Sequence, residues 1–219
     1  MQFRSFPKIP DLPISTLGFG CMRLPTVGGN FSAINEELAT GLVHQAIDAG
    51  VNLFDTAWPY HGEQSEPFLG RAVKGRRDRI HLCTKLPVWA VRQDGDWERF
   101  LDQQLRKLDT DFVDFYLLHG LAAGPWDKVK QLGGLAALER AKADGRIKHI
   151  GFSFHGPLDD FVAIINGYDW DLCLIQLNYV DQGYQAGIQG LALAAQRKVG
   201  VMVMEPLRGG VLAKVPLDV

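Results

Sequence analysis

Short apolar segments recur along the chain and alternate with segments in which apolar residues have helical spacing. Several of the short segments are nearly continuous in apolar residues, which is typical of strands buried on both faces, as in a parallel sheet. The strands expected from this pattern are residues 14–20, 51–57, 79–86, 112–119, 147–154, 172–180 and 199–207.

The segments between these strands predict helices. In residues 37–50 the N-cap is expected at Asn35, the stop at Gly50, and one apolar face is expected to be formed by Leu38, Leu42, Val43, Ala46 and Ile47. A second stripe, in residues 97–110, consists of Phe100, Leu101, Leu105 and Leu108. The further helices are expected in residues 65–75, 135–145, 158–168 and 191–200, whereas residues 120–134, which contain several glycines, are expected to be a loop.

The strand–helix alternation, with a strand about every 30 residues, has the size of a βαβ unit and predicts an α/β fold. An open dinucleotide-binding sheet should carry G-x-G-x-x-G after its first strand, but GFGCMR at residues 18–23 lacks the third glycine. We therefore predict a TIM-type (β/α)8 barrel, which needs eight strands. Because the pattern supplies seven, we expect residues 1–219 to form a single, incomplete barrel domain that lacks the eighth strand and the C-terminal helices.

Composition narrows the class of protein. The net charge is −2 and no basic block stands out, so nucleic-acid binding has no electrostatic support. The first 15 residues lack the apolar core of a signal peptide, and no apolar run is long enough to span a membrane. The cysteines Cys21, Cys83 and Cys173 are too far apart for a metal or redox motif, so we expect reduced packing residues in a cytoplasmic protein.

Polar side chains stand where the predicted strands end, and in a barrel the carboxyl ends of the strands form the active-site face. Each residue taken alone also fits an ordinary structural role, but neighbouring strands would bring them together. They are Asp55 with Tyr60 on the loop that follows it, Lys85, His119, Ser153, Gln176 with Asn178, and Glu205 with Pro206.

Four of these residues predict a proton-donor site. A tyrosine has a pKa of about 10, and a nearby cation lowers that pKa. We expect Lys85 to supply the cation for Tyr60, Asp55 to hold Lys85 in its charged form, and His119 to orient a carbonyl oxygen. Because no protein group is an obvious nucleophile for the carbonyl carbon, a hydride from a bound nicotinamide is expected.

The segments FDTAWPYHGEQSEPFLGRAVK, HLCTKL, DFYLLHG, GFSFHG, QLNY and EPLRGG, in this order, resemble the aldo-keto reductases. The resemblance extends from about Leu17 to Pro216 and is strongest to a bacterial branch whose members often carry a C-terminal iron–sulfur module, although this chain has no cysteine cluster for one. It implies a (β/α)8 barrel, NADPH as cofactor with NADH as the alternative, and a small aldehyde or ketone as substrate.

The resemblance also implies residue roles. The catalytic tetrad would be Asp55, Tyr60, Lys85 and His119, with Tyr60 as proton donor. The cofactor would contact Asp55, the segment Cys21, Met22 and Arg23, the carboxamide partners Ser153 and Gln176, and the pyrophosphate loop with Pro206, Leu207 and Gly209. Two positions depart from the family pattern: Phe154 replaces an asparagine, and Met204 replaces the aromatic residue that packs on the nicotinamide.

Alternatives remain open from the sequence. The chain could be a nicotinamide-binding sensor or regulatory barrel with weak catalysis, or a Schiff-base aldolase that uses Lys85. Trp58, Trp89 and Trp126 could line an apolar substrate pocket or pack in the core. Because seven strands leave two edges unpaired, we expect this chain to be unstable, to aggregate or to borrow an edge from another chain, and to bind NADPH weakly or not at all.

Overall fold

A computed structural model describes residues 1–214. Its main feature is a parallel sheet with the strand order β3-β4-β5-β6-β7-β8-β9. These strands are Gly18–Gly20, Leu53–Asp55, His81–Leu86, Val113–Leu121, Ile147–Phe154, Leu172–Gln176 and Gly200–Met204. Because the sheet follows the order of the chain and is parallel throughout, the predicted class, a TIM-type barrel with seven strands present, is confirmed.

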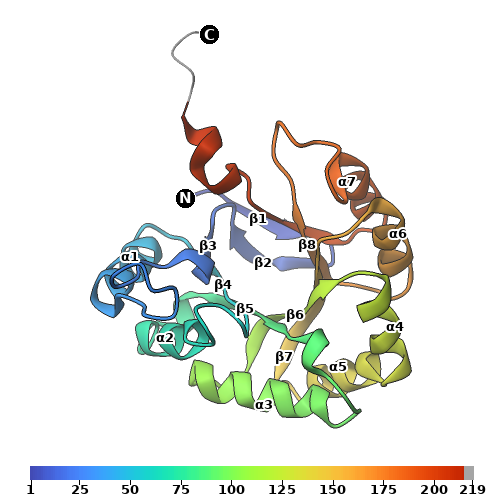
Figure 1. Ribbon diagram of the computed structural model, residues 1–219, viewed down its shortest axis with the longest axis horizontal. Helices are drawn as coiled ribbons and strands as arrows, with labels where there is room; N and C mark the ends of the chain where they lie inside the picture. The colour runs from blue at the N-terminus through green and yellow to red at the C-terminus, as the bar shows by residue number, and fades with distance from the viewer. Residues whose placement is uncertain (215–219) are drawn as a thin grey trace.

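The helices lie around the outside of the strands (Figure 1). They are α1 (Glu36–Asp48), α2 (Ser65–Ala72), α3 (Asp96–Leu108), α4 (Ala123–Gln131), α5 (Gly134–Ala143), α6 (Leu158–Asn166) and α7 (Gly187–Gln196). Short 3-10 segments η1 (Cys21–Arg23), η2 (Arg77–Arg79), η3 (Val88–Ala90) and η4 (Arg208–Ala213) complete the order. Within residues 1–214, no helix combines the length and the apolar character that a bilayer span requires.

An N-terminal hairpin closes one end of the barrel, and the sequence pattern did not reveal it. Strands β1 (Phe3–Phe6) and β2 (Ile9–Ser15) pair antiparallel with each other, so the predicted first strand at residues 14–20 is wrong over its first half. Ile9 and Ile14 of the hairpin are buried and belong to one apolar cluster with interior residues of the barrel strands. Phe6 meets the ring of Phe115 edge-on at 5.9 Å. The hairpin therefore closes the interior at the amino ends of the strands, opposite the predicted site.

Two helix predictions need correction. Residues 120–134 are not a loop, because residues 123–131 form α4, in which Trp126 and Val129 lie three residues apart and are both buried. In α1, Asn35 caps the helix as predicted, since its Oδ1 accepts from Leu38 N at 3.2 Å. The apolar face of α1 is narrower than predicted: the side chains of Leu38 and Leu42 are exposed, and the buried residues are Ala39, Val43 and Ile47.

The close packing of α2 against α3 gives a direct stability prediction. A Cβ on Gly70 would lie 2.7 Å from the backbone carbonyl group of Leu108, so Gly70→Ala is expected to lower the free energy of unfolding by about 1–3 kcal/mol. A Cβ on Gly41, inside α1, would have no other atom within 4 Å. Gly41→Ala is therefore expected to raise the free energy of unfolding by about 0.5–1 kcal/mol. Urea unfolding of the two variants measures both changes. Equal effects of the same sign would contradict this account of the α2–α3 contact.

Candidate functional site

The barrel interior changes from apolar to polar along each strand. Leu53, Cys83, Leu117 and Leu174 belong to the interior apolar cluster. Because alternate residues of a strand face the same side, the residue two positions later also faces inward. Those residues are Asp55, Lys85, His119 and Gln176. By the same two-residue spacing, Ser153 faces inward after Gly151 on β7, and Met204 faces inward after Met202 on β9. The strand-end residues predicted from the sequence therefore face one common space at the carboxyl ends of the strands.

Lys85 is the centre of the polar group. Its ammonium Nζ donates to both carboxylate oxygens of Asp55 at 2.7 Å and to the carbonyl of Thr56 at 2.8 Å. The same Nζ lies 3.3 Å from the hydroxyl of Tyr60. The Lys85 side chain is only 1% exposed, so solvent does not compete for its donors. The end of β5 and the loop after β4 thus place the cation next to the phenol.

The charges of this group favour a cationic Lys85. Burial alone would lower the pKa of Lys85, but the negative charge of Asp55 and the hydrogen bond to it raise that pKa above its ordinary value. For Tyr60, burial raises the pKa, and the nearby Lys85 cation opposes this rise without cancelling it. Lys85 thus acts on the Tyr60 pKa in the expected direction, but the desolvation of the phenolate is larger and keeps that pKa above its ordinary value.

His119 lies across from Tyr60. The two rings meet edge-on with their centroids 6.0 Å apart, and Trp89 lies on the other side of His119 with a centroid distance of 5.1 Å. Burial, helped by the charge of Lys85, lowers the pKa of His119 from 6.5 to about 3. Its Nδ1 is buried and has no hydrogen-bond partner within residues 1–214. A neutral imidazole with an uncommitted ring nitrogen therefore lies beside the ring of Tyr60.

Ser153 and Gln176 form a second polar pair next to this group. Ser153 Oγ accepts from Gly120 N at 2.9 Å, which leaves its own hydrogen free to donate. The Gln176 side chain is 3% exposed, and its Oε1 is buried without a partner in the described part of the chain. One free donor and one free acceptor on adjacent strands can bind a primary amide such as a nicotinamide carboxamide. Asn178, in contrast, is committed, because its side chain bonds to Val180 N, Asp181 N and the Asp181 carboxylate.

The segments predicted to contact the rest of the cofactor lie at opposite edges of the sheet but meet at one point. Cys21 is buried in η1 with its carbonyl accepting from Ser65 Oγ, and Met22 and Arg23 are exposed. A Cβ on Gly209 would lie 3.1 Å from the Arg23 guanidinium, so η1 and the start of η4 are neighbours. Pro206 and Leu207 are exposed just before Gly209, which has a φ of 68°. Pro216, the end of the sequence resemblance, lies outside the described residues.

The three tryptophans do not share one role. The ring of Trp126 is 4% exposed and packs against Trp170 in the core, so it does not line the site. Trp58 packs edge-on against Phe100 of α3 and carries the Lys107 ammonium 3.4 Å from its ring centroid. Trp89 alone is both exposed and in contact with the site, beside His119. Of the three tryptophans predicted to line an apolar pocket, Trp89 is therefore the one that lies at the site. Trp58 packs the loop that carries Tyr60 against α3.

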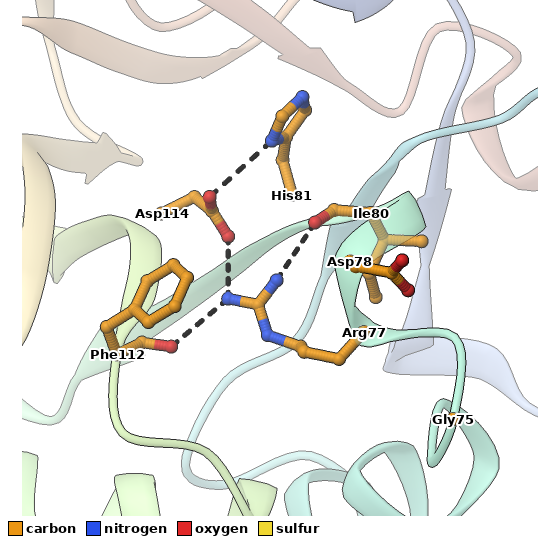
Figure 2. A pocket seen from close by; sticks show the side chains of 7 residues that line it. All are labelled: Gly75, Arg77, Asp78, Ile80, His81, Phe112 and Asp114. Carbon is orange, nitrogen blue, oxygen red and sulfur yellow. Dashed lines mark hydrogen bonds and ion pairs between the residues drawn. The ribbon is translucent and has the colours of Figure 1, made fainter.

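A shallow pocket at the other end of the strands is not part of this site. Its lining comes from Gly75, from η2 and from residues at or just before the amino ends of β5 and β6 (Figure 2). There the guanidinium of Arg77 donates to the carbonyls of Ile80 and Phe112 and to the Asp114 carboxylate. Asp114 also accepts from Leu82 N. These groups satisfy one another, so they fix the amino ends of β5 and β6.

Because the folded state keeps His119 neutral, acid should destabilise the protein through this residue. Its folded pKa of about 3 lies below the ordinary histidine pKa of 6.5, so the unfolded chain binds more protons between these pH values. Stability from this residue is complete above pH 6.5 and is lost as the pH falls. We expect the free energy of unfolding of the parent chain to fall between about pH 7.5 and about pH 5.5. Roughly 1 kcal/mol of this fall should be absent in His119→Gln.

Urea unfolding at the two pH values measures this loss. The exposed surface residue Gln45 is a matched site, and Gln45→Ala should keep the full pH dependence of the parent chain. An unchanged loss in His119→Gln would contradict the burial of a neutral His119.

Comparison with known proteins gives the class of protein that this fold and site define. The family model described as the aldo/keto reductase family matches residues 16–216. An aldo-keto reductase from Bacillus halodurans, solved in its holo form, superposes with a TM-score of 0.78 at 28% identity over 100% of this chain and 70% of that chain. An aldo-keto reductase from Klebsiella pneumoniae, solved in complex with NADPH, superposes with a TM-score of 0.76 at 26% identity over 96% of this chain and 70% of that chain.

The chain therefore belongs to the aldo/keto reductase family. Among curated proteins it is 28% identical to the uncharacterized oxidoreductase YqkF of Bacillus subtilis (strain 168), over 95% of this chain and 66% of that protein. It is 29% identical to the L-galactose dehydrogenase of Arabidopsis thaliana, over 93% of this chain and 65% of that protein. The chain thus spans slightly less than two thirds of the length of these relatives.

Proposed function

We propose that this protein reduces an aldehyde or a ketone to an alcohol with a nicotinamide cofactor, and that Tyr60 is the proton donor. One observation carries the proposal: the Lys85 ammonium lies between the Asp55 carboxylate, at 2.7 Å, and the Tyr60 hydroxyl, at 3.3 Å. This group stands at the carboxyl ends of the strands, where barrel enzymes have their active sites.

The charges around Tyr60 suit a general acid. Because burial raises the pKa of Tyr60, its hydroxyl is protonated at neutral pH and has a proton to give. As the proton leaves, negative charge develops on the phenol oxygen next to the Lys85 ammonium, which stabilises it. Asp55 keeps Lys85 charged and aimed at this point. Lys85 therefore acts on the product of the proton transfer rather than by ionising Tyr60 beforehand.

His119 would orient the substrate. A neutral imidazole carries one N–H, which can donate to a carbonyl oxygen next to the Tyr60 hydroxyl. The protonated form is disfavoured because burial and Lys85 lower the His119 pKa to about 3. The exposed ring of Trp89 beside His119 offers an apolar wall, which suits a carbonyl compound with an apolar substituent.

The residues present fit a nicotinamide cofactor, which supplies the hydride to the carbonyl carbon when it is bound. Ser153 and Gln176 would hold the carboxamide through their free donor and acceptor. Met204 would pack on the ring face. The Cys21–Arg23 segment, Asp55 and the loop with Pro206, Leu207 and Gly209 would contact the remainder. NADPH is the proposed cofactor, since the Klebsiella pneumoniae relative was solved with it and a Schizosaccharomyces pombe relative carries NADP(+) in its name.

The geometry speaks against the aldolase alternative. A Schiff-base lysine attacks as the neutral amine, which requires a lowered pKa. The Lys85 pKa is raised, and its ammonium hydrogens are engaged by Asp55 and the Thr56 carbonyl. Lys85 is therefore held in the form that cannot attack a carbonyl.

Titration of NADPH fluorescence followed by an aldehyde-dependent absorbance assay tests the proposal. We expect saturable binding and NADPH consumption that depends on added aldehyde. Ser153→Ala and Gln176→Leu should weaken binding, whereas Gln45→Ala, at an exposed position of α1, is the control substitution that should leave binding unchanged. Binding without turnover across a panel of aldehydes and ketones would reject the reductase and support the sensor alternative.

A further inference from the structure

A cluster of polar side chains is buried behind β5, on the side away from the proposed site. Glu66 of α2, Thr84 of β5, Gln104 of α3 and Tyr116 of β6 are each fully buried, with exposed fractions of 0%. Burying four polar groups is costly unless they bond to one another, and such clusters hold their members in one arrangement when satisfied. Nothing in the proposed proton transfer uses these residues directly.

Gln104 is the residue that connects this cluster. Its amide Nε2 lies 2.5 Å from Glu66 Oε1, 3.2 Å from Thr84 Oγ1 and 3.1 Å from the backbone carbonyl of Lys85. Its Oε1 accepts from the Tyr116 hydroxyl at 2.7 Å. Glu66 Oε1 also accepts from Thr84 Oγ1 at 2.6 Å. The amide of Gln104 is thus fixed in rotation by Glu66 and Tyr116, with a donor directed at Lys85.

The Lys85 carbonyl needs a donor from outside the sheet. On β5, the Cys83 carbonyl accepts from Thr56 N at 2.9 Å. Alternate carbonyls of a strand face the same neighbour, so the Lys85 carbonyl faces that side as well. However, the pairing of β4 with β5 ends at Asp55 and Cys83. Gln104 supplies the hydrogen bond at the point where the sheet no longer does, directly at the residue that carries the ammonium group.

The same face of α3 also supports the loop that carries Tyr60. Phe100, Gln104 and Lys107 are spaced four and three residues apart and therefore lie on one face of the helix. Phe100 and Lys107 both contact Trp58, and Lys107 Nζ bonds to Glu63 Oε2 at 2.9 Å. One helix face thus contacts both the backbone of Lys85 and the loop that holds Tyr60.

We propose that Gln104, fixed by Glu66 and Tyr116, is a positioning residue that sets the place of Lys85 relative to Tyr60. The inference rests on the proposed function, because it assigns Gln104 a role in that proton transfer. Without the donor at the Lys85 carbonyl, the backbone at the end of β5 shifts and the ammonium group moves away from the Tyr60 hydroxyl. The phenolate that develops during proton transfer then loses its stabilisation.

The test compares two variants that differ only at Gln104. Gln104→Met alone would leave the buried Tyr116 hydroxyl without its acceptor and could unfold the chain. The informative pair is therefore Tyr116→Phe and the double variant Gln104→Met/Tyr116→Phe, which both lack that hydroxyl. Leu101→Ala, at a buried apolar position of α3, provides a packing control that loses stability without touching the polar cluster.

The first readout needs no activity. Reductive methylation followed by peptide mapping measures how fast Lys85 reacts relative to Lys74, whose side chain is 79% exposed. We expect Lys85 to stay protected in the parent chain, in Tyr116→Phe and in Leu101→Ala, and to react severalfold faster in the double variant. Equal protection in the double variant would overturn the proposal, even if that variant is less stable.

The second readout is the pH dependence of alcohol oxidation, which requires the Tyr60 phenolate. In the double variant we expect turnover to fall about tenfold to a hundredfold and the KM for NADP to change by less than about twofold. The rising limb of the pH profile should move to higher pH. A parallel loss in Leu101→Ala, or an unmoved limb, would reduce Gln104 to a packing residue. Absence of turnover in the parent chain would reject the proposed function, while the methylation result would still decide the positioning of Lys85.

Discussion

Tyr60→Phe is expected to lower NADPH-dependent carbonyl reduction by at least about a hundredfold, since a positioned general acid contributes about 10²–10⁴-fold. The phenol hydroxyl lies 3.3 Å from the Lys85 ammonium, where its proton can leave next to a positive charge. The substitution removes one oxygen and leaves the ring in place against His119. Turnover should therefore fall while the affinity for NADPH stays close to that of the parent chain.

Tyr168→Phe is the matched control for this substitution. Its hydroxyl also bonds to a side chain, that of Glu139, but Tyr168 stands between α6 and β8, away from the carboxyl ends of the strands. Steady-state kinetics with one aldehyde should show normal turnover for Tyr168→Phe. Turnover near that of the parent chain in Tyr60→Phe would remove Tyr60 from the mechanism.

Lys85→Met is expected to lower turnover by up to about a hundredfold, and no further than Tyr60→Phe does, because Lys85 acts through the Tyr60 oxygen. Without the cation, the influences that remain on the Tyr60 pKa are burial, the Asp55 charge and the nearby Cys83, and all of them raise it. Forming the phenolate then requires more free energy, so reduction slows. The rising limb of the pH profile for alcohol oxidation moves to higher pH. The pH dependence of turnover in both directions measures the effect.

The control for Lys85→Met is Lys142→Met. Lys142 also forms an ion pair, with Asp171 at 2.8 Å, but at the residue that precedes β8, opposite the site. Circular dichroism shows whether each variant folds, because Asp55 loses its partner in Lys85→Met and such a loss can cost about 3–5 kcal/mol when the charge is buried. A folded Lys85→Met variant with normal rates would make Lys85 a structural residue only.

The sequence pattern predicted the strands that carry the site because those strands are buried on both faces. Ile147–Phe154 is a strand over the same residues as predicted, and Asp55 and Lys85 stand at or next to the ends of β4 and β5. The polar residue at the end of an apolar run was therefore a sound signal. The N-terminal hairpin gave no such signal, since β1 reads FRSF with three exposed residues. The apolar residues of the hairpin are buried only because they pack against the barrel that the hairpin closes.

The residues missed by sequence reasoning are those that act through tertiary contacts. In α3 the predicted stripe of Phe100, Leu101, Leu105 and Leu108 is buried, but Gln104 lies in the same stripe and was passed over as polar. A polar residue within a predicted buried face was the available signal. Its partners Glu66 and Tyr116 come from other elements, so no local pattern could join them. The net direction of the Tyr60 pKa likewise depends on how deeply the barrel buries the phenol.

The most direct test of the central claim, that Lys85 acts through Tyr60, is the turnover of the double variant Tyr60→Phe/Lys85→Met measured with both single variants. If the only catalytic role of Lys85 is to stabilise the charge that develops on Tyr60, removing it should cost little once the phenol oxygen is gone. We predict a double variant within about threefold of Tyr60→Phe, far from the product of the two single losses. Losses that multiply would show that the two residues contribute independently and would contradict the account.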